Sequence, residues 1–561
     1  MTRDSLPTYA APSAEVAQLP LKAGSAGIRG VVISSAAGTA FEWYDFFVFG
    51  ALASILSKQF TAGDPTAGFI FTLGAFAAGF LVRPFGAMFF GRMGDLHGRK
   101  VAFLTTITLM GLATIGIGLL PTAEMAGPAA AVLLVVARVI QGFAMGGEYG
   151  GAAVYVAEYA PAHRRGFLTS WIQTAAAAGL LCALAAVLAT RTLLGEEAFV
   201  AWGWRVPFLL SSLLLLISLL VRARLEESPV FTAMKAHQGL AKAPLAEAFR
   251  GPNLRTMLIA LFAILLAQGA IWYAMHFYVQ FFLERVIKLP GVTVNILMAA
   301  AVVASSGFYV AFGALSDRVG RRPVMLGGMI VALLCMYPGF RMLTTLGNPD
   351  LATAAARAPI VVAANPGDCG LAFDVLGQGK GQSSCDVVKR ALADAGAPYR
   401  NATAPAGAAA TVTVGASRIE GRPLAGLSPE AAKLEQERFA GELRRGLAAA
   451  GYPPAADPAK INEAGLFVVI LLLMACSAAL YGPQAAALVE LFPTAIRYTA
   501  FSIPYNVGTG WIGGFLPITA FAMVVSTGNL YAGLLYPAVF TVISIAAMLL
   551  FLPETRGKPL S

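Results

Sequence analysis

Twelve long apolar runs constrain the fold of this chain more than any other feature of its sequence. A membrane-spanning helix needs about 20 mainly apolar residues. Only 12% of the 561 residues are charged, whereas soluble domains carry about 25%. We therefore expect an all-α membrane protein with twelve transmembrane helices. Their expected positions are 28–57, 67–90, 101–120, 129–157, 167–190, 205–223, 256–283, 293–314, 323–343, 464–489, 499–525 and 530–552.

A charged decapeptide recurs between two apolar runs in each half of the chain. The first copy reads Gly91-Arg-Met-Gly-Asp95-Leu-His-Gly98-Arg99-Lys100. The second copy reads Gly313-Ala-Leu-Ser-Asp317-Arg-Val-Gly320-Arg321-Arg322. The copies are 222 residues apart (317 − 95). Two copies in equivalent positions predict two related six-helix bundles.

The residues of the first copy suit a tight connection between two helices, and the same argument holds for the second. Gly91 would let a neighbouring helix approach closely, and Gly98 would allow a turn with positive φ. Asp95 can accept hydrogen bonds from backbone N–H groups at a neighbouring helix start, or pair with a cation. Arg99 and Lys100 are expected against the lipid headgroups. A plain topogenic charge cluster is the alternative for one copy, but the duplication favours a gating motif.

A second repeat supports the two halves and locates extra chain. Tyr149-Gly150, Glu158, Pro161 and Arg165 match Tyr481-Gly482, Glu490, Pro493 and Arg497. This offset is 332 residues (490 − 158), against 222 for the decapeptides. The difference of about 110 residues indicates an insertion in the second half, visible as the hydrophilic stretch at 344–462.

The insertion has the pattern of a small α/β subdomain. Residues 360–364 and 411–414 are typical of strands. Ser384 can cap a helix over 386–395, and Ser428 can open a second helix that runs to about residue 450. A structureless loop of this length would be unusual in a folded protein.

The five cysteines divide between the spans and the insertion. Cys182, Cys335 and Cys476 fall in expected spans, whereas Cys369 and Cys385 lie in the insertion. Because the insertion is expected outside the cytoplasm, in an oxidising compartment, we predict a disulfide between Cys369 and Cys385. Two free thiols are the alternative.

Cationic residues gather in alternate connections, which sets the orientation by the positive-inside rule. This rule places both termini and the central loop in the cytoplasm and the insertion outside it. No apolar segment of a cleavable signal peptide is evident before the first run. The expected divisions are an N-terminal tail (1–27), a first bundle (28–223), a central loop (224–255), a second bundle (256–343 and 463–553), the insertion (344–462) and a C-terminal tail (554–561).

Several function classes are disfavoured by the sequence. We find no zinc-ligand spacing, P-loop, dinucleotide-binding glycine pattern or nucleophile elbow, so no enzyme activity, metal or cofactor is expected. The net charge of +10 lies in short loops between helices and suits anionic lipid headgroups better than nucleic acid. The expected partners are the lipid bilayer and a small-molecule substrate, with the chain as a monomer.

Several motifs resemble those of the major facilitator superfamily. The paired decapeptides are its most specific signature, and the tail at 553–557 resembles the ending common in sugar porters. Within the superfamily, further stretches resemble the metabolite:proton symporter family, which includes carriers of citrate, 2-oxoglutarate, shikimate and proline/betaine. These stretches are residues 41–46, 80–86, 138–142, 146–151, 202–207 and 227–231. The resemblance implies two six-helix bundles that import a solute with protons by alternating access, in a cell (inner) membrane.

Charged side chains inside spans are costly and by default suggest function. Glu42 and Asp45 lie on one face of the first run. By resemblance, Asp45 and Arg138 occupy the places of the aspartate and arginine that couple protons in sugar porters. A permanent structural ion pair and no contact at all are the alternatives. Glu148 is a second candidate proton carrier, or else an acid that only supports helix packing.

The substrate is expected to meet polar and aromatic groups at mid-membrane depth. Arg83 could bind a substrate carboxylate, or it could support the Asp95 loop. The other candidates are Trp43, Gln173, Tyr273, His276, Gln280, Tyr481, Gln484, Tyr505 and Asn506. We expect proton-coupled uptake of a small organic anion, such as a mono-, di- or tricarboxylate. The alternatives are a zwitterion or sugar symporter, and a transporter-like sensor that binds its ligand through the insertion.

Overall fold

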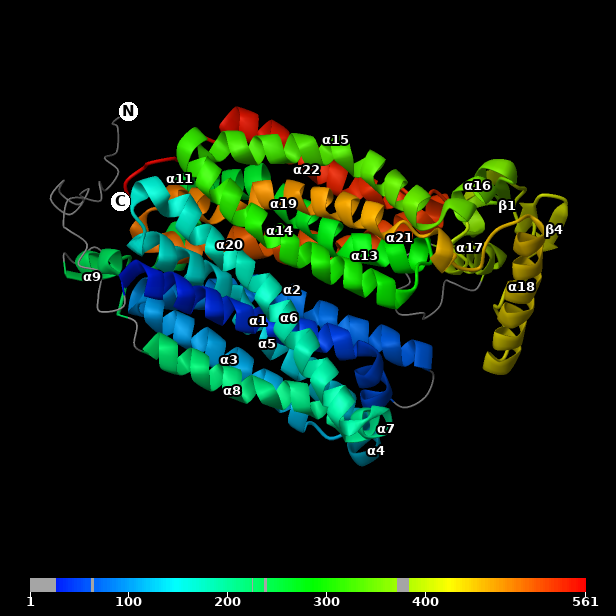
Figure 1. The fold of residues 1–561 in the computed structure, drawn as a ribbon, viewed down its shortest axis with the longest axis horizontal. Helices are drawn as coiled ribbons and strands as arrows, with labels where there is room; N and C mark the ends of the chain where they lie inside the picture. Colours follow the sequence, from blue (N-terminus) through cyan, green and yellow to red (C-terminus); the bar gives the residue numbers. More distant parts are fainter. Residues whose placement is uncertain (1–26, 62–64, 224–225, 237–239, 371–382, 561) are drawn as a thin grey trace, which may run out of the picture.

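The computed structural model describes residues 27–61, 65–223, 226–236, 240–370 and 383–560 (Figure 1). The expected N-terminal tail, apart from residue 27, therefore lies outside the described residues. The first half forms a bundle of six long helices that run along the long axis of the molecule. They are α1 (Gly27–Phe60), α2 (Pro65–His97), α3 (Arg99–Leu119), α5 (Pro128–Tyr159), α6 (Arg165–Leu194) and α8 (Arg205–Ala223). Shorter helices join or follow them: α4 (Ala123–Ala126), α7 (Glu196–Ala198), α9 (Pro229–Ala236) and α10 (Pro244–Ala248).

The second half repeats this pattern with two helices that contain π-helical stretches. One continuous helix comprises α11 (Gly251–Ala260), η4 (Leu261–Leu265), α12 (Leu266–Tyr273), η5 (Ala274–Tyr278), α13 (Val279–Phe281) and η6 (Phe282–Val286). Another comprises α20 (Arg497–Asn506), η10 (Val507–Gly513) and α21 (Leu516–Thr527). The remaining long helices are α14 (Gly291–Val319), α15 (Arg321–Gly347), α19 (Glu463–Leu491) and α22 (Leu535–Phe551). Such π-helical stretches occur frequently at functional sites.

The decapeptides are almost wholly helical, which corrects the expected span ends near residues 90 and 314. Helix α2 continues to His97 and α14 to Val319, so a single glycine separates each from the next helix. Gly98 and Gly320 have φ of 119° and 112°, a conformation that side chains disfavour. The helices continue because the charged residues of the decapeptides have protein partners, described below.

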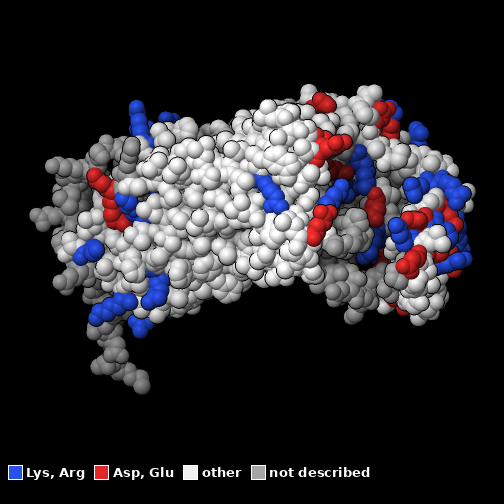
Figure 2. Space-filling model, turned by 90° about the horizontal axis from the view of Figure 1, so that it is seen from below, with Lys and Arg blue, Asp and Glu red and all other residues white. Residues whose placement is uncertain are grey.

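Ten helices within the described residues are long and apolar enough to cross a membrane. Helices α1 and α2 run beside them in the first bundle (Figure 1). In the space-filling view, charged side chains gather near the two ends of the molecule, and the broad zone between them is nearly free of charge (Figure 2). This distribution suits a hydrocarbon layer around the middle of the molecule.

The two halves pack along two helix pairs, α2 with α20 and α6 with α14. Glycines allow the backbones to touch, because a Cβ on Gly91 would lie 2.8 Å from Cα of Thr499. A Cβ on Gly313 would lie 2.6 Å from the carbonyl oxygen of Gly166. The close approach expected at both decapeptide glycines is therefore present, and it brings the halves together.

The insertion is an α/β subdomain at one end of the molecule, here called the insertion end (Figure 1). The opposite end, which holds the decapeptides and the C-terminus, is called the loop end. The strands are β1 (Ile360–Ala364), β2 (Tyr399–Thr403), β3 (Thr411–Val414) and β4 (Ser417–Glu420), and the helices are α16 (Pro349–Arg357), α17 (Ser384–Asp394) and α18 (Pro429–Ala449). The strand order is β2-β1-β3-β4, with β1 and β2 parallel and the other pairs antiparallel.

The sequence identified the two central strands of this sheet but missed both edge strands. Most residues of strands β2 and β4 are exposed, so these strands lack an apolar pattern. The expected cap of α17 was also one residue too late. Ser383 caps this helix by accepting a hydrogen bond from the Asp386 N–H, and the Asp386 carboxylate accepts one in return. Ser428 caps α18, as predicted.

The insertion caps two helix ends of the second bundle. The carbonyl groups in the last turn of a helix have no partner within that helix. At the end of α21, the Tyr399 N–H donates to the Gly528 carbonyl at 3.0 Å, and Asn401 Nδ2 donates to the Thr527 carbonyl at 3.1 Å. Beyond η6, Asn348 Nδ2 donates to the Ile287 carbonyl at 2.9 Å. The subdomain is therefore held to the helices by hydrogen bonds as well as by its two covalent connections.

Cys369 and Cys385 form a disulfide in the structure, with 16 residues of sequence separation. Closing a loop of about 15 residues should stabilise the insertion by roughly 3 kcal/mol in the chain-entropy model. We expect the double substitution of both cysteines by serine to lower the stability of the insertion by about that amount. Hydrogen exchange of β1 and α17 would measure the loss, with Cys335→Ser as the control. Alkylation of Cys369 and Cys385 under denaturing, non-reducing conditions would contradict the disulfide.

Candidate functional site

The decapeptide aspartates connect the two halves of the protein at the loop end. The Asp95 carboxylate, at the end of α2, accepts hydrogen bonds from the N–H groups of Tyr498 at 3.1 Å and Thr499 at 2.9 Å. These two residues begin α20 in the other half. Asp95 also pairs with Arg99, whose Nη1 lies 2.6 Å from Oδ1. Both roles considered for this carboxylate are therefore present together.

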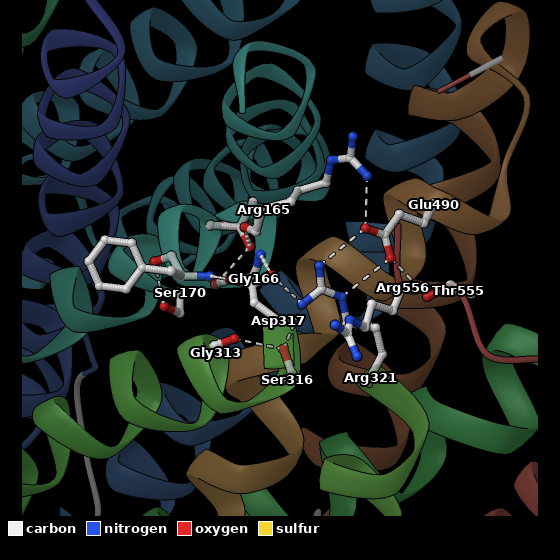
Figure 3. Close-up of polar contacts among 12 residues, drawn as sticks. Arg165, Gly166, Ser170, Gly313, Ser316, Asp317, Arg321, Glu490, Thr555 and Arg556 are labelled. Atoms are coloured by element: carbon white, nitrogen blue, oxygen red, sulfur yellow. Dashed lines mark hydrogen bonds and ion pairs between the residues drawn. The ribbon is translucent and has the colours of Figure 1, made fainter. Parts of the chain in front are cut away.

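The second copy makes the same contacts with the halves exchanged (Figure 3). The Asp317 carboxylate accepts hydrogen bonds from the N–H groups of Gly166 at 2.9 Å and Phe167 at 2.7 Å, at the start of α6. Arg321 Nη1 lies 2.6 Å from Asp317 Oδ1. A carboxylate at a helix N-terminus is stabilised by the unpaired N–H groups and by the helix dipole. The motif thus joins α2 to α20 and α14 to α6.

The expectation that the decapeptide cations face lipid headgroups is wrong for Arg99 and Arg321. Their side chains are 0% and 1% exposed. Glu158 lies 3.6 Å from Arg99 and 3.1 Å from Arg497, and Glu490 lies 3.2 Å from Arg321. Because these glutamates come from the second repeat, the two repeated motifs form one buried ionic network. The last cation of each decapeptide donates to a carbonyl group: Lys100 to Ala223 and Arg322 to Leu549.

The analysis of the sequence missed two acidic residues that complete this network. Glu227 accepts hydrogen bonds from the N–H groups of Arg99 at 3.1 Å and Lys100 at 3.2 Å, and so caps α3. Glu554 accepts those of Arg321 at 2.9 Å and Arg322 at 3.1 Å, and so caps α15. A signal was available, because each glutamate follows the last long helix of its half and precedes a hydroxyl residue.

We expect Asp317→Asn to destabilise the contact between the halves at the loop end. Removing one partner of a buried ion pair typically costs about 3–5 kcal/mol. A cysteine placed at Ser170, which lies beside Gly313, should therefore become more accessible to a thiol reagent. The matched control is Asp350→Asn, whose ion pair with Lys460 is exposed and should contribute only about 0–1 kcal/mol. Equal labelling rates in both variants would contradict the proposed contact energy.

A cavity lies between the two halves. Helices α1, α2, α5 and α6 line it from the first half, and α12, α19, α20 and η10 line it from the second. Its lining residues are Thr39, Glu42, Trp43, Arg83, Met145, Tyr149, Gln173, Gln268, Trp272, Tyr273, Tyr481, Tyr505, Asn506 and Thr509. Most of the expected substrate residues therefore meet in one place, together with Tyr149 and Trp272, which had not been predicted.

Aromatic contacts close the cavity towards the insertion end. Phe46 on α1 packs against Phe277 on η5 with ring centroids 5.9 Å apart. Phe80 on α2 packs against Tyr273 at 6.0 Å. Since each pair joins one half to the other, the rings separate the cavity from the insertion end.

Hydrogen bonds and stacked tyrosines close the other side of the cavity. Asn506 Nδ2 donates to the Gly146 carbonyl at 2.8 Å, across the two halves. Tyr149 stacks on Tyr505 with centroids 4.2 Å apart, and the Tyr505 and Tyr481 hydroxyls lie 2.7 Å apart. The structure therefore represents an occluded arrangement, closed on both sides of the cavity.

The cavity contains one acidic and one basic residue among its described lining, Glu42 and Arg83. The Arg83 guanidinium lies over the Phe80 ring, 4.3 Å from its centroid, and donates to Met145 Sδ at 3.3 Å. Its Nε has no hydrogen-bond partner among the described residues, and the same holds for both amide atoms of Gln268. Buried polar groups normally have partners. These groups are therefore available to a polar ligand.

Asp45 faces away from the cavity lining and is linked to Arg138 through two other side chains. Thr114 Oγ1 donates to Asp45 Oδ2 at 2.7 Å. Gln141 Nε2 donates to Thr114 Oγ1 at 2.6 Å, and Arg138 Nη1 donates to Gln141 Oε1 at 2.7 Å. Asp45 and Arg138 are 3% and 5% exposed. The predicted pair thus belongs to one buried chain of hydrogen bonds.

Glu148 lies next to the cavity on the side of the loop end, where it pairs with an unexpected partner. Arg222 Nη2, from the end of α8, lies 2.8 Å from Glu148 Oε1, and Thr106 Oγ1 donates to Oε2 at 2.7 Å. Both charged side chains are 1% exposed. From the sequence, Arg222 looks like a surface cation, because it lies at the end of a span.

Three expected substrate residues lie outside the cavity lining. His276 Nδ1 lies 2.9 Å from the Trp272 carbonyl oxygen, and Gln280 Nε2 donates to Asn295 Oδ1 at 3.2 Å nearer the insertion end. Gln484 is fully buried on α19, and its amide atoms have no hydrogen-bond partner among the described residues. These side chains share helices with cavity residues but lie one or more turns away from them.

Comparison with known proteins identifies relatives for most of the chain outside the insertion. The family described as "Sugar (and other) transporter" matches residues 31–257 and 447–561. The glycine betaine/proline/ectoine/pipecolic acid transporter OusA of Dickeya dadantii is 34% identical over 331 residues, which are 57% of this chain and 65% of that protein. The shikimate transporter of Escherichia coli is 35% identical over 324 residues, 56% of this chain and 72% of that protein. The chain thus matches slightly less than two thirds of the length of its betaine-transporting relative.

Solved structures share the fold. The proton:xylose symporter XylE, a major facilitator superfamily protein, superimposes with a TM-score of 0.59 at 17% identity, over 95% of this chain and 97% of that chain. At that identity the likeness concerns the fold alone. The two bundles, the paired loop motifs and the family match lead to one conclusion: the chain belongs to the sugar (and other) transporter family, and the relatives that it matches are transporters.

Proposed function

We propose that this protein is a proton-coupled importer of a small carboxylate-bearing solute, working by alternating access. The observation that carries the proposal is the occluded cavity between the halves, which presents Glu42 and Arg83 among aromatic side chains. A closed central site of this kind suits a transporter in which two rigid bundles rock around a bound substrate.

The proposed topology has twelve spans with both termini in the cytoplasm of a cell whose inner membrane holds the protein. Ten described helices meet the length and composition of a span, and we assign α1 and α2 as the other two. The cationic decapeptides make the loop end cytoplasmic by the positive-inside rule. The insertion then lies outside the cytoplasm, where a disulfide is stable.

The decapeptides act in this proposal as the inner gate. The hydrogen bonds of Asp95 and Asp317 to helix starts in the opposite half must break before the cavity can open to the cytoplasm. The buried glutamates Glu158 and Glu490 hold the same interface together. Because the two decapeptides make equivalent contacts, we expect both sets of hydrogen bonds to break together when the inner gate opens.

The geometry favours a zwitterionic substrate over the organic anion expected from the sequence. The anion rested on two intramembrane arginines, but Arg138 is not among the cavity-lining residues. Arg83 can bind a carboxylate through two parallel hydrogen bonds. The rings of Trp43 and Trp272, whose centroids lie 5.3 Å apart, suit a substrate ammonium group. The relative OusA, named for glycine betaine and proline transport, is consistent with this choice.

A monocarboxylate anion is the second candidate, and one observation favours it. If Glu42 carries the transported proton, it is neutral when the substrate binds, and the cavity then presents only the positive charge of Arg83. The shikimate transporter among the relatives handles such a substrate.

Uptake into proteoliposomes tests the proposal. Radiolabelled glycine betaine and shikimate serve as the two probes, with and without a pH gradient that is alkaline inside. We expect betaine uptake to rise with the gradient and to collapse when a protonophore is added. Uptake of shikimate alone would select the second candidate. If neither probe accumulates, and no carboxylate, betaine or sugar shifts the melting temperature, the proposed function is wrong.

Deletion of residues 350–458 distinguishes between two hypotheses: a transporter, and a sensor that binds its ligand through the insertion. A transporter should retain gradient-driven uptake, with lower thermal stability because the end of α21 loses the hydrogen bonds from Tyr399 and Asn401, at about 1 kcal/mol for each bond. The variant Asn401→Ala, which keeps the insertion but removes the side-chain donor to the Thr527 carbonyl, is the matched control for part of that loss of stability. Complete loss of uptake in a correctly folded deletion variant would favour the sensor.

A further inference from the structure

Arg222 is the least expected charged group in the first bundle. Although it is the second-to-last residue of α8, its side chain points into the bundle and is 1% exposed. Its guanidinium carbon lies 3.4 Å from the centroid of the Phe103 ring, and Nη1 donates to the Phe103 carbonyl at 3.2 Å. Nη2 pairs with Glu148 at 2.8 Å, while Nε has no hydrogen-bond partner among the described residues. This arginine therefore has hydrogen-bonding capacity to spare.

A glycine on α1 makes room for this guanidinium. A Cβ on Gly38 would lie 1.5 Å from Arg222 Nη2, so any side chain there would displace the arginine. Glu42 lies four residues later on α1, one helical turn nearer the middle of the membrane on the same face. Glu42 lines the cavity, while Glu148 pairs with the arginine from α5. The guanidinium thus lies between a cavity carboxyl group and a buried one.

We propose that Arg222 is a positioning residue for proton transfer, shared between Glu148 and Glu42 across the gap at Gly38. This inference rests on the proposed proton-coupled transport. In the occluded state Arg222 pairs with Glu148, and the proton is on Glu42. When the O–H bond of Glu42 breaks, its proton is transferred to a carboxylate oxygen of Glu148, and Arg222 moves from Glu148 to the new carboxylate on Glu42.

The proton transfer leaves the net charge of Glu42, Glu148 and Arg222 unchanged, which avoids the cost of an unpaired buried charge. One carboxylate and one guanidinium remain paired before and after the step, so no buried charge is left without a partner. Among the described residues, the other charged or titratable groups near Glu42, Glu148 and Arg222 include Arg83 on α2, Asp45 on α1, Tyr273 on α12, and Tyr498 and Tyr505 on α20. Glu148 then holds the proton on the side of the loop end, next to Gly147, whose carbonyl accepts a hydrogen bond from Tyr498 across the two halves.

The test compares gradient-driven uptake with exchange of labelled substrate at equal pH, for whichever probe the wild-type protein transports. We expect Arg222→Gln to lower driven uptake by tenfold or more while exchange changes little, because the carboxylate on Glu148 or Glu42 then has no guanidinium partner during the transfer. Arg222→Lys should recover part of the driven uptake. The matched control is Arg205→Gln at the other end of α8, where the arginine donates to the carbonyl groups of Gly118 and Leu120 and lies over the Trp204 ring.

Two further variants keep the inference falsifiable if Arg222→Gln fails to assemble. Gly38→Ala removes no charge but occupies the gap, and it should also lower the ratio of driven uptake to exchange. Combining Glu148→Gln with Arg222→Gln should be no worse than Arg222→Gln alone, since both remove the same acceptor. Parallel loss of driven uptake and exchange in the Arg222 and Gly38 variants would show a purely structural role. Absence of driven uptake in the wild-type protein would instead refute the proposed function itself.

Discussion

Asp45→Asn is expected to remove gradient-driven uptake and to leave substrate exchange largely intact. An amide is nearly the same size as a carboxylate and can keep the hydrogen bond to Thr114, but it cannot bind and release a proton. We expect driven uptake to fall by roughly tenfold or more, to the level measured without a pH gradient. Proteoliposome uptake and counterflow in the same preparation measure the two activities separately.

The control for this prediction is Glu124→Gln, because Glu124 is an exposed acid in the short helix α4, away from the cavity. It should transport like the wild-type protein. Driven uptake that persists in Asp45→Asn would remove Asp45 from the coupling step. Coupling would then rest on Glu42, the carboxyl group that lines the cavity, and on Glu148 without Asp45.

Arg83→Gln is expected to raise the apparent KM for the substrate by about 10- to 100-fold. A hydrogen bond to a charged group contributes about 1.5–3 kcal/mol, and each 1.4 kcal/mol corresponds to about a tenfold change in affinity. Arg83→Lys should fall between the two, because lysine keeps the charge but not the planar pair of donors. Initial uptake rates over a range of substrate concentrations give the KM of each variant.

Arg92→Gln is the matched control for Arg83, since Arg92 lies on the same helix but is exposed. Its KM should be unchanged. If Arg83 instead only supports the decapeptide, its replacement would lower the rate without changing KM. The effect of Arg83→Gln on transport would then resemble that of Asp317→Asn rather than that of a substitution in the substrate site.

The architecture could be predicted because the signals that define it are local or repeated. The length of an apolar run indicates a span regardless of the neighbours of that helix. The duplicated decapeptides identified two related halves, and the difference in offset located the insertion. The edge strands β2 and β4 were missed because most of their residues are exposed and polar, although they are as long as the two strands that were predicted. The ends of α2 and α14 were missed because charged residues normally indicate a loop, and here other buried charges compensate them.

The chain's own sequence thus determined that this is a two-bundle membrane protein with a disulfide-bearing insertion. Only the tertiary structure decided which polar residues meet. Glu42 and Asp45 are three residues apart, yet one lines the cavity and the other bonds to Thr114. Spans that are apolar on most sides do not reveal which face points inward, because their sequences lack the amphipathic pattern that would indicate it. The pairing of Arg222 with Glu148 likewise depends on how α5 and α8 pack, across 74 residues of sequence.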